Sequence, residues 1–249
     1  MDVNEIHVTS ILNLVARHGI TISPALKILD FGCGRGDVTH CLRNRGFQAY
    51  GCDIVVPGDA TETTRSYLRD GTIRQIASSP YRIPFDDDAF DVVFSNQVFE
   101  HVMDYSSALA ELRRVTAPQG VGLHIFPSRY CFLEPHVFIP LATILQNKYW
   151  LRPWAWLGIR NAYQQGLSSS ETVEMNYRFL AEQTNYKKKR QIRREFSAHF
   201  ERCEFVEWEN FLDSFPRVYR IVGRREFIPR TWGWFFSAFD HRWVFVQRT

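Results

Sequence analysis

Residues 28–37 read I-L-D-F-G-C-G-R-G-D, and this stretch decides the fold. The apolar residues before the glycines predict a short buried strand, and residues 38–45 suit a helix. Between them, Gly32, Gly34 and Gly36 let the backbone turn sharply and let a ligand approach closer than any Cβ would allow. A glycine turn between a strand and a helix predicts a nucleotide site in an α/β fold.

The spacing of these glycines differs from that of a dinucleotide-binding loop. That loop reads G-x-G-x-x-G/A, with a pyrophosphate at the N-terminus of the helix. Here the third glycine comes one residue early, and Asp37 occupies the position that needs Gly or Ala. Because a carboxylate would repel a pyrophosphate, the spacing favours a ligand with a nucleoside but no phosphate. The phosphate-binding pattern G-x-x-x-x-G-K-[ST] is also absent.

A second predicted strand, at 48–53, ends on an acid. Asp53 follows Gly32 by 21 residues, a position from which a carboxylate can accept both hydroxyls of a ribose. The glycine loop and this acid together predict an adenosine site at the carboxyl edge of a parallel sheet.

The first half of the chain alternates strand and helix patterns. Helices are expected at 6–18, at 38–45 and from the N-cap Asp104 to a stop at 117–120. Strands are expected at 27–31, 48–53, 72–77, 90–95 and 121–126. Strands separated by helix-length segments imply right-handed crossovers and a mostly parallel sheet.

The alternation stops after Pro127, and residues 128–200 are expected to be mostly helical. Ser168 and Glu171 fit a capping box for a helix that runs toward Thr184. A further helix is expected at 187–200, and closing strands at 203–211 and 242–247.

We therefore predict a Rossmann-like α/β fold. It has a seven-stranded, mostly parallel sheet with helices on both faces and a helical, aromatic-rich insertion after the fifth strand. In this prediction 1–249 is one domain, made of a cofactor-binding half (1–127), an insertion or substrate cap (128–200) and closing strands (201–249).

Composition divides the chain at the same place. Residues 1–127 hold 11 of the 37 aromatic residues and carry 11 basic and 15 acidic side chains. The remaining residues hold 26 aromatics, with 19 basic and 12 acidic side chains. An aromatic, basic second half favours a substrate side that binds an acidic or phosphate-bearing molecule, such as a nucleotide-linked or lipid-linked sugar.

Three features favour a cytoplasmic protein. The start, M-D-V-N-E-I-H, lacks the basic and apolar regions of a secretory signal. The longest charge-free apolar stretch, 136–147, falls short of the roughly 20 residues that a bilayer requires. The five cysteines form no C-x-x-C pair, so we expect neither a zinc site nor a disulfide framework.

Four segments, in this order, resemble the class I S-adenosyl-L-methionine-dependent methyltransferases, in particular the type 11 group. They are the glycine loop, I-P-F-D-D-D-A-F-D-V-V at 83–93, S-N-Q-V-F-E-H-V at 95–102 and E-L-R-R-V-T-A-P-Q-G at 111–120. Two departures are Ala77-Ser78-Ser79, where many members have an adenine-contacting acid, and Gln119, where the family has glycine.

The resemblance implies S-adenosyl-L-methionine as cofactor and assigns its contacts. Asp30, Gly32, Gly34 and Gly36 would surround the methionine portion. Asp53 would hold the ribose, and Ile54 would flank the adenine.

The catalytic candidates are His101, Glu134 and His136. An acid and a histidine two residues apart could orient an acceptor hydroxyl and take its proton, although a polar turn would give the same pattern. In some quinone O-methyltransferases a segment related to Glu100-His101 binds a divalent metal with an additional acid. Gln97 occupies that acid's place here, so the sequence predicts no metal and leaves a loop-bracing role open.

The leading hypothesis is a methyltransferase for a small molecule or glycan, acting at oxygen. A nucleic-acid or protein methyltransferase would use the basic run at 187–194, which could also touch a membrane surface. However, Ile192, Phe196 and Phe200 give that segment a buried stripe, which favours a solvated basic face and no nucleic-acid partner. A non-catalytic methyltransferase-like binding subunit is the third hypothesis.

Overall fold

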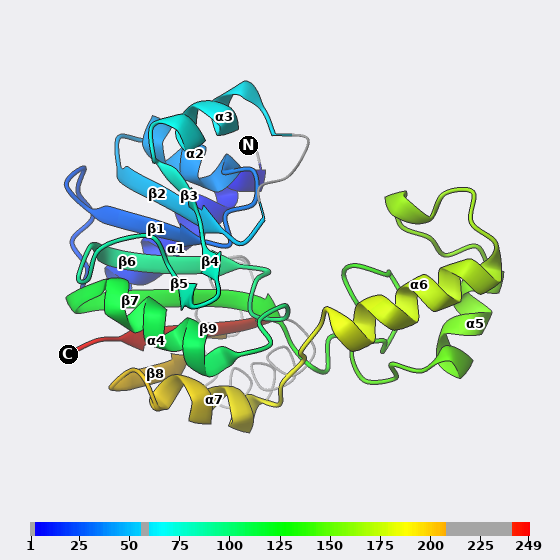
Figure 1. Ribbon diagram of the computed structural model, residues 1–249. Coiled ribbons are helices and arrows are strands. Elements are labelled where there is room, and N and C mark those ends of the chain that lie inside the picture. Colours follow the sequence, from blue (N-terminus) through cyan, green and yellow to red (C-terminus); the bar gives the residue numbers. More distant parts are fainter. Residues whose placement is uncertain (1–2, 56–59, 208–240) are drawn as a thin grey trace, which may run out of the picture.

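The computed structural model of the chain describes residues 3–55, 60–207 and 241–249. The main body is built on a seven-stranded sheet, and a smaller lobe projects from one side of it (Figure 1). The strands of the sheet are β1 (Lys27–Phe31), β2 (Gln48–Asp53), β3 (Ile73–Gln75), β6 (Phe90–Asn96), β7 (Thr116–Pro127), β8 (Arg202–Phe205) and β9 (His241–Gln247). Their spatial order is β3-β2-β1-β6-β7-β9-β8. All neighbours from β3 to β7 are parallel, and β9 runs antiparallel to both β7 and β8.

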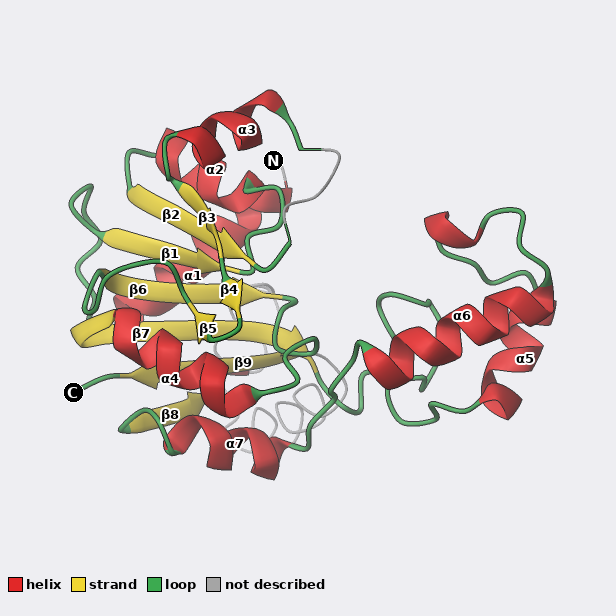
Figure 2. Cartoon of the chain, viewed as in Figure 1, coloured by secondary structure: helices red, strands yellow, loops and turns green. Residues whose placement is uncertain are grey.

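Helices cover both faces of the sheet (Figure 2). They are α1 (Val3–Arg17), α2 (Asp37–Asn44), α3 (Glu62–Arg69), α4 (Tyr105–Val115) and α7 (Lys189–Ser197). Successive residues of a strand point to opposite faces, so Ile28 packs in one apolar cluster with residues of α1 and α2. Leu29 packs in the other, with residues of α4 and α7. The predicted fold class is confirmed.

The projecting lobe has an apolar core of its own. It contains α5 (Lys148–Trp156), the 3-10 turn η1 (Ala162–Gln164) and α6 (Ser169–Glu182). Val137, Leu151, Leu180 and Tyr186 are among the buried residues of this core. Ser168 and Glu171 form the expected capping box at the start of α6.

Two observations differ from the expected organisation of residues 128–200. Residues 128–147 contain no helix, so the prediction of a mostly helical segment is wrong there. Pro135 and Pro140 lack the N–H that a helix needs, and Phe138 and Leu141 have φ of 57° and 56°. In addition, α7 lies within this range, yet its buried residues Ile192 and Phe196 belong to the core of the main body.

Several shorter elements also differ from the prediction. Helix α3 and the small hairpin of β4 (Ala77–Ser78) and β5 (Tyr81–Arg82) were not expected. Strand β7 begins at Thr116 and so includes the segment 117–120, which was expected only to end a helix. The expected strand 203–211 is seen as β8, and its last residues lie outside the described part.

Two expectations from the sequence, one on the cysteines and one on membrane-spanning segments, can be compared with the described residues. The five cysteines are free thiols. No described helix is both long and apolar enough to cross a membrane.

Candidate functional site

The three glycines of the loop after β1 have different roles. All adopt positive φ (77°, 52° and 79° for Gly32, Gly34 and Gly36), a region that side chains disfavour. A Cβ on Gly32 would lie 2.2 Å from Cγ2 of Val98, and one on Gly36 would lie 2.3 Å from Cδ1 of Ile73. A Cβ on Gly34 would meet nothing within 4 Å. The outer glycines therefore permit packing within the protein, and Gly34 faces open space.

Asp53, at the end of β2, lies beside this loop as predicted. One carboxylate oxygen accepts the N–H of Gly34 at 2.8 Å, and the other accepts the N–H of Val55 at 3.2 Å. The next residue, Ile54, is 54% exposed although it is apolar. Asp53, Gly34 and the exposed side chain of Ile54 thus lie at the same edge of the sheet.

Asp30 is buried in β1 beneath the loop. Its carboxyl accepts a hydrogen bond from the Thr39 hydroxyl at 2.9 Å. Burial, helped by the nearby charge of Asp53, raises the pKa of Asp30 to about 7. Asp30 is therefore poised between its two protonation states near neutral pH.

The candidates Glu134 and His136 form a pair at the base of the lobe. Nδ1 of His136 donates to Glu134 at 2.8 Å, and the Tyr186 hydroxyl donates to the same oxygen at 2.5 Å. The N–H of Val137 donates to the other oxygen at 2.6 Å. Burial alone would raise the pKa of Glu134, but these hydrogen bonds outweigh it and lower that pKa.

His101, which follows β6, lies against this pair. Its Nε2 is 3.2 Å from Nε2 of His136, and its Nδ1 donates to the carbonyl of Gln183 at 2.7 Å. Burial lowers the pKa of His101. For His136 burial acts in the same direction, but the hydrogen bond and charge of Glu134 outweigh it and raise the pKa. The structure thus brings the three predicted catalytic residues together.

The segment that returns from the lobe supplies contacts that the sequence analysis missed. Asn185 donates its N–H to the carbonyl of Glu100 at 2.6 Å and its side-chain amide to the carbonyl of Val102 at 2.9 Å. Tyr186 and Gln183, described above, belong to the same segment. No local pattern marks these residues, because their partners lie some 50 to 80 positions earlier in the chain.

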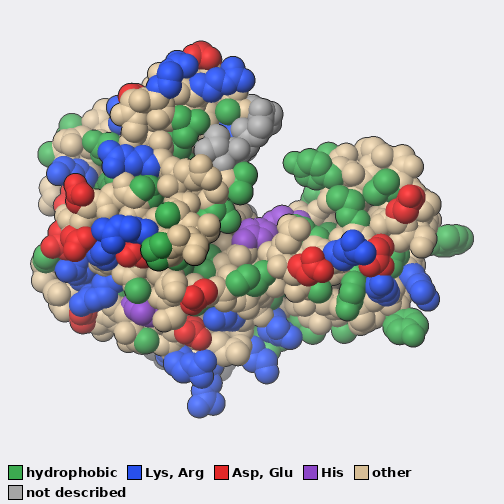
Figure 3. All heavy atoms as spheres, in the orientation of Figure 1, with side chains coloured by type: hydrophobic (Ala, Val, Ile, Leu, Met, Phe, Trp, Pro, Cys, Tyr) green, Lys and Arg blue, Asp and Glu red, His purple; other side chains and the backbone are tan. Residues whose placement is uncertain are grey.

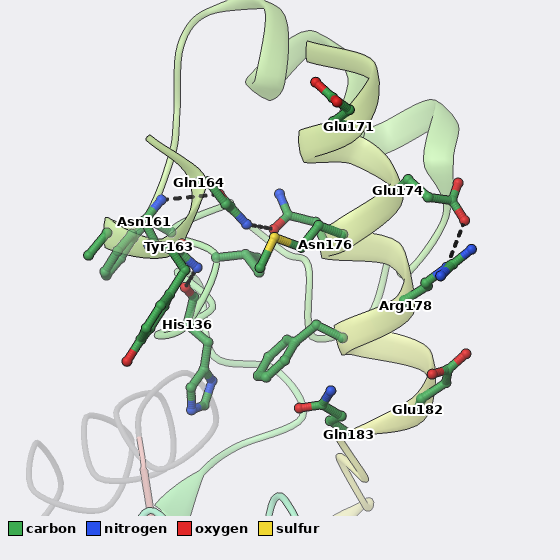
Figure 4. Close-up of a pocket in the computed structure, with 15 residues that line it drawn as sticks. His136, Asn161, Tyr163, Gln164, Glu171, Glu174, Asn176, Arg178, Glu182 and Gln183 are labelled. Atoms are coloured by element: carbon green, nitrogen blue, oxygen red, sulfur yellow. Dashed lines mark hydrogen bonds and ion pairs between the residues drawn. The ribbon is translucent and has the colours of Figure 1, made fainter. Parts of the chain in front are cut away.

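The lobe contains a pocket of about 950 Å³. Figure 4 shows its walls, formed by α6 on one side and by the segment around η1 on the other, with His136 at one end. The lining is mostly apolar and amide, and it includes Phe138, Tyr163, Met175 and Phe179. Histidine side chains lie in the hollow between lobe and main body (Figure 3). His136, which lines the pocket, has its Nε2 3.2 Å from Nε2 of His101, a residue that follows β6 after a short segment.

Two lysines of the basic run at 187–194 contact the main body, whereas its other basic residues are exposed. Lys187 lies 3.8 Å from the centre of the Tyr105 ring and 3.6 Å from a Glu195 oxygen. Lys189 pairs with Glu207 at 3.4 Å. These contacts fit a partly structural basic face.

The strand order, the antiparallel β9 and the acid beside a glycine loop define the class I methyltransferase fold. A solved S-adenosylmethionine-dependent methyltransferase from Mesorhizobium loti has this fold, with a TM-score of 0.51 and 12% identity over 94% of this chain and 96% of that one.

Residues 29–123 match the family model described as a methyltransferase domain. This part of the chain is a class I S-adenosyl-L-methionine-dependent methyltransferase domain of the type 11 group. A demethylmenaquinone methyltransferase from Thermus thermophilus is 35% identical over 96 residues, which are 38% of this chain and 44% of that protein. A malonyl-[acyl-carrier protein] O-methyltransferase from Serratia marcescens is 35% identical over 100 residues, 40% of this chain and 38% of that protein. The matched region thus spans less than half the length of these curated relatives.

Proposed function

We propose that the protein transfers the methyl group of S-adenosyl-L-methionine to the oxygen of a small-molecule or glycan acceptor. The observation that carries this proposal is the shared edge of the sheet. The glycine loop and Asp53 lie where β1 and β2 end, and His101, Glu134 and His136 lie beyond the ends of β6 and β7. A cofactor side and an acid–base side therefore face the same region.

The chemistry requires little more than this arrangement. Methyl transfer from a sulfonium is an in-line displacement: the acceptor oxygen bonds to the methyl carbon as the carbon–sulfur bond breaks. The protein has to hold that oxygen roughly 3 Å from the methyl carbon and to remove its proton. Glu134 fixes the His136 ring through Nδ1, so that Nε2 is left for the proton of the acceptor.

The pocket in the lobe supports an acceptor that is largely apolar. Among its lining residues Glu171, Glu174 and Glu182 outnumber Arg178, which gives no support to the phosphate-bearing acceptor that the charge distribution predicted. The names of the relatives give a demethylmenaquinone and a malonyl group carried on a protein as acceptors, and neither acceptor is a nucleic acid.

Calorimetric titration with S-adenosyl-L-methionine tests the cofactor site. We expect Asp53→Ala to weaken binding at least about tenfold, because the ribose hydroxyls lose their acceptor. Asp91→Asn is the matched control, since Asp91 accepts the N–H of Lys27 at the opposite edge of the sheet. Equal affinity in the wild type and Asp53→Ala would overturn the assignment.

The alternative functions have less support. A nucleic-acid or protein methyltransferase would use the basic run, but Lys187 and Lys189 already pair with glutamates, which leaves the four exposed basic residues of the run for such a partner. A non-catalytic subunit would tolerate damage to the glycine loop, whereas here the loop keeps all three glycines and the N–H of Gly34 donates to Asp53.

A further inference from the structure

A cluster of metal-ligating groups lies where the lobe joins the main body. One ligand atom each of Glu100, His101 and His136 can be chosen so that all three lie within 4.8 Å of one another. Glu100 and His101 follow β6, whereas His136 comes from the lobe. The chain folds back over 35 residues to bring the two imidazoles to a separation of 3.2 Å between their Nε2 atoms.

The partners of the two imidazoles determine which nitrogen carries the hydrogen. A backbone carbonyl can only accept, so the bond from His101 to Gln183 requires a hydrogen on Nδ1. Glu134 also accepts, so His136 carries its hydrogen on Nδ1 as well. In their neutral forms, both Nε2 atoms present lone pairs to each other. Two acceptors at this distance repel unless a cation or a shared proton lies between them.

Glu100 adds a third electron-pair donor. The residue is 1% exposed, and neither carboxylate oxygen has a hydrogen-bond partner among the described residues. A buried carboxylate without a partner is costly. Its nearer oxygen lies 4.0 Å from Nε2 of His101. Because no hydrogen bond holds this side chain in place, a rotation can bring an oxygen closer.

We propose that Glu100, His101 and His136 bind a first-row divalent metal ion of the zinc type. Two imidazoles and one carboxylate suit such an ion better than Mg²⁺ or Ca²⁺, which prefer oxygen ligands. Two nitrogens bound at about 2.0–2.1 Å in a tetrahedral site are about 3.3–3.4 Å apart, close to the observed separation.

The surroundings of the cluster match those of a metal site. Metal-ligating histidines usually donate their other ring N–H to a carboxylate or a carbonyl, and both imidazoles do so here. Tyr186 in turn holds Glu134. The side chains of His101 and His136 are 35% and 28% exposed, which gives an ion access. The ion would also join the lobe to the main body.

This inference shares residues with the proposed function but does not depend on it. An ion and a transferred proton would occupy the same nitrogens, so they are alternative states of one site. Metal binding is measured without S-adenosyl-L-methionine, and the Asp53 titration is done without metal. A negative metal titration therefore does not affect the conclusion from the Asp53 titration, and the reverse also holds.

The test is a titration of the chelator-treated, full-length protein with ZnCl₂ by calorimetry and with CoCl₂ by visible absorption. We expect one ion per chain and d–d bands typical of a site with nitrogen ligands. Glu100→Gln and His136→Ala should each weaken binding at least about tenfold. His40→Ala is the matched control and should leave binding unchanged, since the His40 ring lies on α2 and bonds Tyr67 and Asn44.

Circular dichroism and S-adenosyl-L-methionine binding will establish whether the variants fold, and Glu134→Gln offers a milder change. If His136→Ala does not fold, Glu100→Gln alone decides. No saturable binding, or binding that these substitutions do not alter, would overturn the proposal. An imidazole nitrogen resonance that titrates with pH and ignores added metal would identify a shared proton instead.

Discussion

At the scale of single residues, positive φ and open space at a glycine do not by themselves distinguish a ligand contact from a turn. Gly34 has positive φ and empty space where a Cβ would lie. Gly46 has the same two properties, but it lies in the turn between α2 and β2. Comparing substitutions at Gly34 and Gly46 therefore separates the effect of backbone strain from the effect of ligand contact.

Gly34→Ala and Gly46→Ala should destabilise the protein equally, each by about 1 kcal/mol, because alanine disfavours positive φ. Only Gly34→Ala should weaken binding of S-adenosyl-L-methionine, at least about tenfold, since its methyl group would occupy ligand space. Urea denaturation and calorimetry measure the two effects. A similar loss of affinity in both variants would contradict the assignment of Gly34.

Asp30 gives cofactor binding a dependence on pH. With a pKa of about 7, its carboxyl is mostly protonated in mild acid, and a cationic ligand favours the ionised form. Affinity for S-adenosyl-L-methionine should therefore rise between about pH 6 and about pH 8. In the ligand-free protein, the raised pKa means that this carboxyl makes the fold less stable as pH rises from about 4 to about 7.

Calorimetry across this pH range, with Asp30→Asn as the comparison, measures the effect. The asparagine variant should bind with little pH dependence, because it cannot ionise. An unchanged pH profile in Asp30→Asn would assign the titration to another group.

At the scale of elements, Arg114 at the end of α4 fastens the segment before β6. Its guanidinium donates to Glu111 and Asp87 and to the carbonyls of Ile83 and Phe85. The neighbouring Arg113 forms a more exposed pair with Glu201 at 2.7 Å. Arg114 thus links α4 to the segment before β6, whereas Arg113 forms a single, more exposed ion pair.

Arg114→Ala should lower the free energy of unfolding by about 2–4 kcal/mol, because it leaves a half-buried carboxylate and two carbonyls without their donor. Arg113→Ala should cost under about 1 kcal/mol, as exposed ion pairs do. Chemical denaturation of the two variants provides the comparison. Equal losses would show that the Arg114 contacts contribute no more than a surface pair.

Local patterns were enough to predict the elements of the cofactor half. The strands at Lys27–Phe31 and Gln48–Asp53 have the predicted bounds, and Asp104 accepts the N–H of Ser107 as the expected N-cap. Each of these features depends on periodicity or on a neighbour a few residues away. By contrast, β8 and β9 owe their place in the sheet to partners far along the chain.

The site shows the same limit. The sequence predicted His101, Glu134 and His136 as catalytic residues. The separation of the two histidines along the chain did not predict that their imidazoles would lie side by side, because the path of residues 128–135 determines that distance. Nor could it predict that Asn185 would bond to the segment after β6.

At the scale of the whole molecule, Asn185 couples the lobe to the main body. Asn185→Ala should open this junction, so that backbone amides at 100–103 and 183–187 exchange hydrogen at least about threefold faster. Amides of β1 should be unaffected. Hydrogen exchange with mass spectrometry measures this, and Asn44→Ala on α2 is the control because its side-chain amide bonds His40 on the same helix. No change at the junction would mean that other contacts hold the lobe.

The two chain segments that connect the lobe to the main body lie side by side (Figure 1). Arg129 on the outgoing segment donates to the carbonyl of Tyr186 on the returning one at 2.9 Å. A segment with neighbouring ends can be lengthened, shortened or exchanged at little cost in closure entropy. The match to the methyltransferase domain ends at residue 123, just before the lobe begins. Evolution can therefore replace the proposed acceptor side as one continuous insertion, while the cofactor side diverges only residue by residue.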